Sequence, residues 1–193
     1  MSSTEKRHPR LLVFAGPNGS GKSTVTQNLK TVGLYINADD IKRVSGCTDM
    51  EAAIEAEALR NKMIDKGRDF TFETVLSTDR NVDLLNRAKE AGYEIHVIFV
   101  LTHDPEINVR RVKARAAAGG HDVPEEKVRV RFARSLARVS KIVNIADRVR
   151  IIDNSGYIPI FICEVENHMA QLWPNEHWSK KAILRLLSGA EEV

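Results

Sequence analysis

The segment from Gly16 to Thr24 carries the residue types that hold phosphate groups. It matches the pattern Gly-x4-Gly-Lys-Ser/Thr at every fixed position. Glycines let successive backbone N–H groups point inward at an anion, and a following helix would add its free N–H groups. Lys22 supplies a positive charge for the β- and γ-phosphates, and the Ser23 hydroxyl can bind a Mg²⁺ ion that bridges them. A random chain of this length would match about once in a hundred. The pattern therefore predicts that ATP is bound with Mg²⁺, GTP not being excluded, and the binding residues are Gly16, Pro17, Asn18, Gly19, Ser20, Gly21, Lys22, Ser23 and Thr24.

Two aspartates, Asp39 and Asp40, follow a short apolar segment, residues 34–37. In open α/β sheets, ligands bind beyond the carboxyl ends of the strands. Either carboxylate could therefore act as a general base that accepts a proton from an acceptor hydroxyl. In the alternative interpretation, one of them caps a short helix that begins at Ile41.

Glu73 lies in an apolar and aromatic segment, residues 70–76, that is typical of a strand. A carboxylate is costly to bury in such a strand without a partner. It could hold Mg²⁺ through water or bind hydroxyl groups of the acceptor, or it could face solvent on an edge strand. Thr74 and Ser77 are further candidates for contact with the acceptor.

Arginines are concentrated between residues 105 and 150, where 12 Lys or Arg face 5 Asp or Glu, a balance of 12 − 5 = +7. Most lie on a predicted helical hairpin with a Gly119–Gly120 tip, which could close over a nucleotide and exclude water. Arginine can stabilise the negative charge that develops on a transferring phosphoryl group. In the alternative interpretation, these arginines simply form a helix face exposed to solvent. The residues of interest are Arg110, Arg111, Arg115, His121, Arg129, Arg131, Arg134 and Arg138.

Asn154 belongs to a polar segment, residues 153–156, after a late apolar strand. The segment could be a turn only. Its place at the carboxyl end of a strand also allows contact with the base of the nucleotide.

Strand-like and helix-like segments alternate along the chain, which indicates a parallel sheet with helices on both faces. We expect one domain over residues 1–193, with a flexible tail at 1–9 and a lid at about 104–146. The expected strands are 10–15, 34–37, 70–76, 93–101, 148–153 and 157–165. The expected helices are 22–31, 50–66, 79–91, 104–118, 124–145 and 179–187.

The composition excludes several classes of protein. No apolar run reaches the length of a membrane helix, and the first residues lack the apolar core of a signal peptide. The two cysteines, Cys47 and Cys163, form no CxxC motif, and the six histidines have no metal-binding spacing. We therefore expect a cytoplasmic protein with no membrane association.

Several segments together resemble the zeta-toxin family of P-loop kinases, in particular its short, chromosomally encoded members. They are GPNGSGKST at 16–24, INADDI at 36–41, FETVLS at 72–77, RAAAGGHDVPEEKVRVRFARSL at 115–136 and DNS at 153–155. The first is generic, whereas FETVLS together with GGHDVP is much more specific. The resemblance spans roughly residues 11–155.

This resemblance implies an adenylate-kinase-like α/β fold with a lid, and an activity. The family's toxins phosphorylate a hydroxyl of UDP-N-acetylglucosamine with ATP and Mg²⁺, and an antitoxin protein is a possible partner. Asp39 matches the family's catalytic base, and Glu73 its acceptor-binding glutamate. The phosphate-stabilising arginines match Arg115 and one of Arg129, Arg131 and Arg134, of which we favour Arg131. The chain is shorter than the full toxins, and FETVLS replaces their Glu-Gly-Thr element.

Two other hypotheses stay open from the sequence alone. The basic segment could hold a phosphate backbone, as in a kinase that acts on nucleic-acid or nucleotide ends. The protein could also be a nucleotide-dependent switch with little transfer activity, in which case replacing Asp39 would leave its function unchanged.

Overall fold

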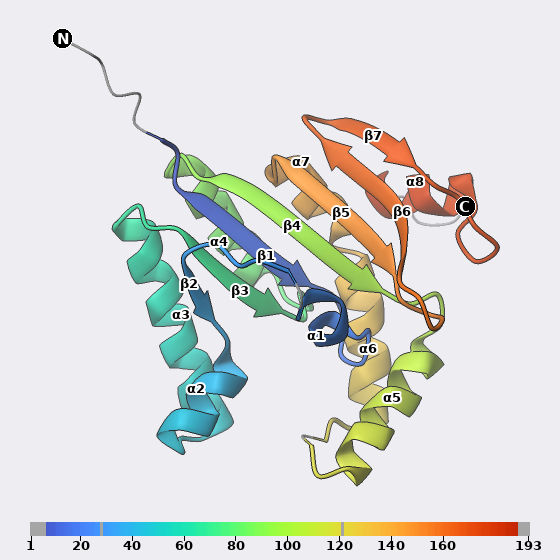
Figure 1. Cartoon of the computed structure of the whole chain (residues 1–193), viewed down its shortest axis with the longest axis horizontal. Helices are drawn as coiled ribbons and strands as arrows, with labels where there is room; N and C mark the ends of the chain where they lie inside the picture. Colours follow the sequence, from blue (N-terminus) through green and yellow to red (C-terminus); the bar gives the residue numbers. More distant parts are fainter. Residues whose placement is uncertain (1–6, 28, 121, 189–193) are drawn as a thin grey trace.

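The described residues of the computed structural model, 7–27, 29–120 and 122–188, form a seven-stranded sheet (Figure 1). Its strand order is β2-β3-β1-β4-β5-β6-β7. The first five strands run parallel, and β6 and β7 add an antiparallel hairpin beyond β5. The strands are β1 (Arg10–Ala15), β2 (Leu34–Ile36), β3 (Phe70–Thr74), β4 (Glu94–Leu101), β5 (Arg148–Asp153), β6 (Ile160–Glu166) and β7 (Met169–Leu172).

Helices lie on both faces of the sheet, but they cover the faces unequally. The helices α3, α4, α7 and α8 pack on one face around a continuous apolar core, while α1 lies on the other face (Figure 1). The helices are α1 (Lys22–Thr26), α2 (Ala38–Ser45), α3 (Asp49–Asp65), α4 (Arg80–Glu90), α5 (Pro105–Ala117), α6 (Glu125–Leu136), α7 (Val139–Ile145) and α8 (Lys180–Ser188).

Strand β4 shows how the two faces differ. Ile95, Val97 and Phe99 are fully buried under the covering helices, whereas His96 and Ile98, on the opposite face, are half-exposed. Alternate side chains of a strand point to opposite faces, so the pattern reports one well-covered face and one partly open face. Farther along, β4 is buried on both sides, where the sheet approaches α1.

Three expectations from the sequence were wrong in detail. The helix that begins at Lys22 ends at Thr26 instead of Thr31, after a run of β-branched residues that favour helices weakly. The helix expected over residues 124–145 is divided into α6 and α7. Strand β7 was not predicted, and the strand expected from residue 157 begins at Ile160.

The ends of the chain are described only in part. Of the tail expected at residues 1–9, the first six lie outside the described residues, and so does His121 at the tip of the predicted hairpin. Arg7 is ordered by an ion pair with Asp69, whose carboxylate lies 2.8 Å from the Arg7 guanidinium. No helix within the described ranges is both long and apolar enough to cross a membrane.

Candidate active site

The predicted phosphate loop connects β1 to α1 at the carboxyl ends of the parallel strands. Its glycines have backbone angles that side chains disfavour, with φ of 141° at Gly16, 75° at Gly19 and 82° at Gly21. A Cβ atom at Gly16 would stand 2.0 Å from the Val100 carbonyl oxygen. The tight packing explains why only glycine fits there, and it gives the loop a fixed shape around an open concavity.

Two buried asparagines support the loop through hydrogen bonds to its backbone. Asn108 Nδ2 on α5 donates to the Asn18 carbonyl at 2.7 Å, and Asn154 Nδ2 after β5 donates to the Ser20 carbonyl at 2.8 Å. The Asn154 carbonyl in turn accepts from Arg111 Nη1 at 2.8 Å. The Asn154 side chain is thus engaged with the loop itself. The contact that we expected from it, with the base of a nucleotide, stays a prediction.

Lys22 is folded back on the loop that precedes it. Its Nζ donates to the carbonyl oxygens of Gly16 at 2.8 Å and Pro17 at 3.2 Å. Burial lowers the pKa of Lys22 to about 8, and among the nearby charges Glu73 opposes this shift most strongly. The amine is therefore placed to exchange two neutral acceptors for a bound phosphate.

This pKa predicts a pH dependence of nucleotide binding. In the free protein Lys22 loses its proton between pH 7 and pH 9, so affinity for Mg·ADP should fall about tenfold over that interval. Fluorescence titration with a labelled ADP would measure the change. The Lys22→Met variant should bind more weakly, with an affinity that stays flat over the same interval. A parent protein and variant with the same slope would contradict the role of Lys22.

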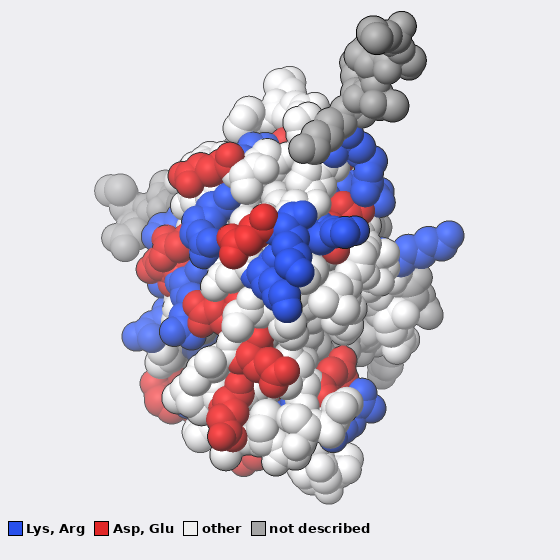
Figure 2. Space-filling model, turned by 90° about the vertical axis from the view of Figure 1, so that its left-hand side faces the viewer, with Lys and Arg blue, Asp and Glu red and all other residues white. Residues whose placement is uncertain are grey.

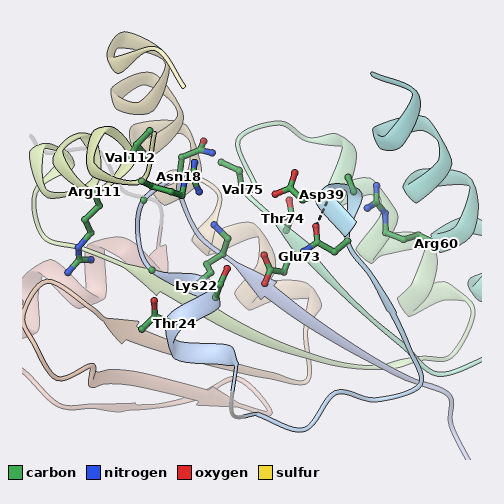
Figure 3. A pocket seen from close by; sticks show the side chains of 16 residues that line it. Asn18, Lys22, Thr24, Asp39, Arg60, Glu73, Thr74, Val75, Arg111 and Val112 are labelled. Carbon is green, nitrogen blue, oxygen red and sulfur yellow. Dashed lines mark hydrogen bonds between the residues drawn. The ribbon is translucent and has the colours of Figure 1, made fainter. Parts of the chain in front are cut away.

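The loop opens into a cavity of about 520 Å³, shown in Figure 3. Lys22 lies at its centre, with Ser23 and Thr24 along the first turn of α1. A second cavity of about 370 Å³ adjoins it, and Asp39 and Arg115 line both. The arrangement provides one compartment over the phosphate loop and another next to it, with a shared wall.

Asp39 reaches this wall from the first turn of α2, a helix that begins earlier than we predicted. The helix starts at Ala38, and the side chain of Asn37 caps it by accepting from the Asp39 N–H at 3.0 Å. The expectation of a helix that begins at Ile41 with an aspartate cap was therefore wrong. Asp40, the neighbouring residue, pairs with Arg43 at 2.7 Å on the surface. Asp39 alone of the two lines the cavities.

Glu73 is half-buried in the first cavity and has a partner that the sequence did not reveal. Its strand, β3, lies between β2 and β1, so the alternative of an edge strand is excluded. Tyr35 on β2 donates its hydroxyl to Glu73 Oε1 at 2.9 Å. Burial and the Glu73 charge raise the pKa of Tyr35 far above its usual value, so the hydroxyl remains a donor. Tyr35 thereby fixes the orientation of the glutamate.

The two hydroxyl residues near Glu73 are placed differently. Thr74 is buried and lines the first cavity, and its Oγ1 accepts from the Leu76 N–H at 2.9 Å and from Asn81 at 2.7 Å. These bonds shape the turn after β3, where Leu76 has a positive φ of 56°. Ser77 lies outside the linings of both cavities.

The helices α5 and α6 form the predicted arginine hairpin. Arg115 on α5 lines both cavities, and Arg131 on α6 lines the second, where its Nη1 donates to Asn18 Oδ1 at 3.2 Å. Arg129 instead binds Glu106 at 2.7 Å and Glu125 at 3.0 Å. Of the three α6 arginines considered from the sequence, Arg131 is therefore the one that faces a cavity.

Most of the other cations in the basic segment form ion pairs. The pairs are Lys113–Glu125, Arg138–Asp79, Lys141–Asp79, Arg148–Glu166 and Arg150–Glu164. On the face that carries α2 and α3, positive and negative side chains are likewise interspersed (Figure 2). The net charge of the segment therefore does not translate into a continuous positive strip, which weakens the hypothesis of a nucleic-acid substrate.

A strand, a glycine loop and a helix that together form a concave anion site, within a mostly parallel sheet, define a P-loop protein of the kinase type. The family model described as "Zeta toxin" matches residues 1–165, and the chain belongs to this family. The predicted fold class is confirmed.

Individual relatives agree with this assignment. The chain is 31% identical over 129 residues to a Haemophilus influenzae protein described as uncharacterized, a match that covers 64% of this chain and 92% of the relative. The crystal structure of AvrRxo1-ORF1:-ORF2 with ATP superposes with a TM-score of 0.72 at 13% identity, over 98% of this chain and 67% of that one. The PezAT chromosomal toxin–antitoxin system of Streptococcus pneumoniae gives 0.56 at 17% identity, over 81% and 75%. At these identities the likeness to the solved structures concerns the fold.

Proposed function

We propose that the protein is an ATP-dependent kinase that transfers the γ-phosphate to a hydroxyl group of a small-molecule acceptor. The observation that carries this proposal is the position of Asp39 on the wall shared by the two cavities. A nucleotide held by the phosphate loop and an acceptor in the second cavity would meet at this carboxylate.

The residues around the shared wall suit an in-line transfer. Asp39 accepts the proton of the acceptor hydroxyl, whose oxygen attacks the γ-phosphorus as the bond to the β-phosphate oxygen breaks. Lys22 stabilises the negative charge on the phosphates during the transfer. Arg115 and Arg131, on the hairpin, stabilise the transferring group. ADP and the phosphorylated acceptor are the products. Glu73, held by Tyr35, binds a further hydroxyl of the acceptor.

The loop fits a nucleotide with Mg²⁺. Added Cβ atoms at its glycines would collide with their surroundings, and Ser20 Oγ is buried without a hydrogen-bond partner among the described residues. Ser23, which lines the cavity on α1, would hold the ion through its Oγ, and the ion would supply positive charge to the phosphates of the nucleotide. A cluster of three or more acidic, His or Cys ligands is not found in the described ranges. Mg²⁺ needs no such cluster, because it takes most of its ligands from phosphate and water.

Membership of the zeta toxin family favours UDP-N-acetylglucosamine or a related sugar nucleotide as the acceptor. It also favours a protein partner, since the PezAT neighbour is described as a toxin–antitoxin system. We propose both on this basis.

The decisive experiment is incubation with ATP, Mg²⁺ and UDP-N-acetylglucosamine, followed by mass spectrometry. We expect a product heavier by one phosphoryl group, absent without acceptor and absent with the Lys22→Ala variant. Nucleotide binding without this product would exclude the sugar nucleotide and direct the search to other hydroxyl acceptors. The absence of nucleotide binding would overturn the kinase proposal itself. Replacing ATP with GTP in a parallel reaction would determine the preferred donor.

A further inference from the structure

Arg60, on α3, is a buried arginine that the proposed transfer does not use. Its side chain lines the first cavity and is only 9% exposed. The guanidinium lies over the ring of Phe72, 5.1 Å from the ring centroid. No sequence pattern singles it out, because it lies in the middle of a helix rich in Ala and Glu.

The guanidinium lacks the counter-ion that a buried arginine usually has. Arg60 Nε is buried without a hydrogen-bond partner, and no ion pair joins Arg60 to a carboxylate within the described residues. Glu57, the acidic residue that acts most strongly on it, pairs with Arg80 at 3.2 Å. Taking a charge out of water without a partner is strongly unfavourable. An anion in the adjoining cavity would supply the missing partner.

A second source of positive potential lies next to Arg60. Arg60 lines the same cavity as Ala38 and Asp39, the first residues of α2. The first N–H groups of a helix have no partner within the helix, and here the Asn37 side chain satisfies only that of Asp39. The free N–H groups at the beginning of α2 therefore face the same cavity as Arg60, and an anion held there would also lie near the carboxylate of Asp39.

The part of the cavity beside Arg60 is separate from the phosphate loop. In Figure 3, Arg111 and Arg60 lie on opposite sides of the cavity, with Lys22 between them. In the proposed transfer, the phosphates of the nucleotide would lie at Lys22 and the reacting hydroxyl at Asp39. A group beside Arg60 therefore belongs to the acceptor and not to the nucleotide.

We propose that Arg60 and the first turn of α2 form a subsite for an oxyanion of the acceptor, a phosphate or carboxylate group. The proposal rests on the kinase function and adds a requirement, namely that the acceptor carries an anionic group as well as its reacting hydroxyl. The planar guanidinium, which lies over the ring of Phe72, could donate two parallel N–H groups to such an anion. Neutral polyols would leave the guanidinium unpaired and would bind poorly.

The test uses the full chain saturated with Mg²⁺ and AMPPNP, so that the phosphate loop is already filled. Inorganic phosphate is then added, and ¹⁵N NMR follows the Nε–H of Arg60 and the backbone amide of Ala38. We expect both signals to shift with saturable binding. A parallel titration with acetate identifies the class of anion, because the tighter ligand shows whether a phosphate or a carboxylate fits.

Variants show whether Arg60 binds an anion or only supports the fold. Arg60→Met should weaken anion binding at the Ala38 amide at least tenfold, and Arg60→Lys, which keeps the charge without the fork, should weaken it less. Arg87→Met removes an exposed cation that lies 3.7 Å from Asp65, outside the linings of both cavities, and should bind like the parent. Unmoved signals in the parent, or parent-like binding by Arg60→Met, would overturn the proposal.

The same spectra keep the two proposals distinct. AMPPNP binding is read at the amides of Gly19 and Gly21, far from Arg60. If those amides fail to respond, the kinase function is wrong. If they respond while neither anion moves the Arg60 signal, the kinase function stands and the oxyanion subsite does not exist.

Discussion

Replacing Asp39 with asparagine is expected to lower phosphoryl transfer by about 10² to 10⁴-fold, the usual contribution of a positioned general base. The amide has the same shape, but it cannot accept the hydroxyl proton. Asp39 lies on the shared wall and is not part of the phosphate loop, so nucleotide affinity should change by no more than about twofold. A fall in kcat with an unchanged dissociation constant for Mg·ADP is thus the expected signature.

Asp40→Asn is a closely matched control for this prediction. It removes the same charge one residue farther along α2, from a side chain that pairs with Arg43 on the surface. Its transfer rate should equal that of the parent. Equal losses in the two variants would mean that the effect comes from the helix and not from a base. An Asp39→Asn protein with parental activity would favour the hypothesis of a nucleotide-dependent switch.

The Lys22→Ala substitution is expected to cost about 10² to 10³-fold in transfer, the range observed when one preorganised charge on a transition state is removed. Nucleotide binding should also weaken, in contrast to Asp39→Asn. The fold should not suffer. The folded-state pKa near 8 lies below the ordinary 10.5, so at pH 7 the charged ammonium disfavours the folded chain. Its removal should therefore leave the unfolding temperature unchanged or raise it.

Single-turnover kinetics and thermal unfolding measure these two effects separately. Lys42→Ala serves as the control, because this lysine on α2 pairs with Asp49 at 2.7 Å outside the loop. Loss of activity together with a marked fall in the unfolding temperature of Lys22→Ala would point to collapse of the loop, and the catalytic interpretation would then fail.

The sequence predicted the parts of the fold that local patterns determine. Strands such as β1 and β4 are uniform apolar segments, and their places in a parallel sheet follow from the alternation with helices. Strand β7 was missed because its Met, Ala, Gln and Leu residues favour helix as much as strand. The tight turn before it, with φ of 49° at Asn167 and 64° at His168, is the only local signal for this hairpin. Antiparallel pairing with β6 makes this segment a strand.

The break between α6 and α7 also depends on distant contacts. No Gly or Pro interrupts the helical pattern there. Ser135 donates its hydroxyl to the Val75 carbonyl at 2.7 Å, and Arg138 pairs with Asp79 at 2.9 Å. These bonds join the end of α6 to the turn after β3, and they redirect the chain in a way that no local pattern reveals.

In the candidate site, too, local patterns were predicted from the sequence and distant contacts were not. The loop was predicted from its own residues, because its spacing alone specifies a phosphate cradle. The long-range contacts that support the site came from the structure only. Tyr35 meets Glu73 across 38 positions, and Asn108 meets Asn18 across 90. A polar residue within an apolar segment is a weak signal of such a contact, and its partner cannot be read from spacing.

The ion pairs of Arg129 have a mechanical consequence. Arg129 ties α6 to α5 through Glu106, while its bond to Glu125 braces it within α6. Two helices tied in this way move as one lever. Arg115 and Arg131, which we propose to stabilise the transferring group, therefore keep their spacing if the hairpin moves. The entropy of ordering them relative to each other is then lost once, during folding, instead of in every catalytic cycle.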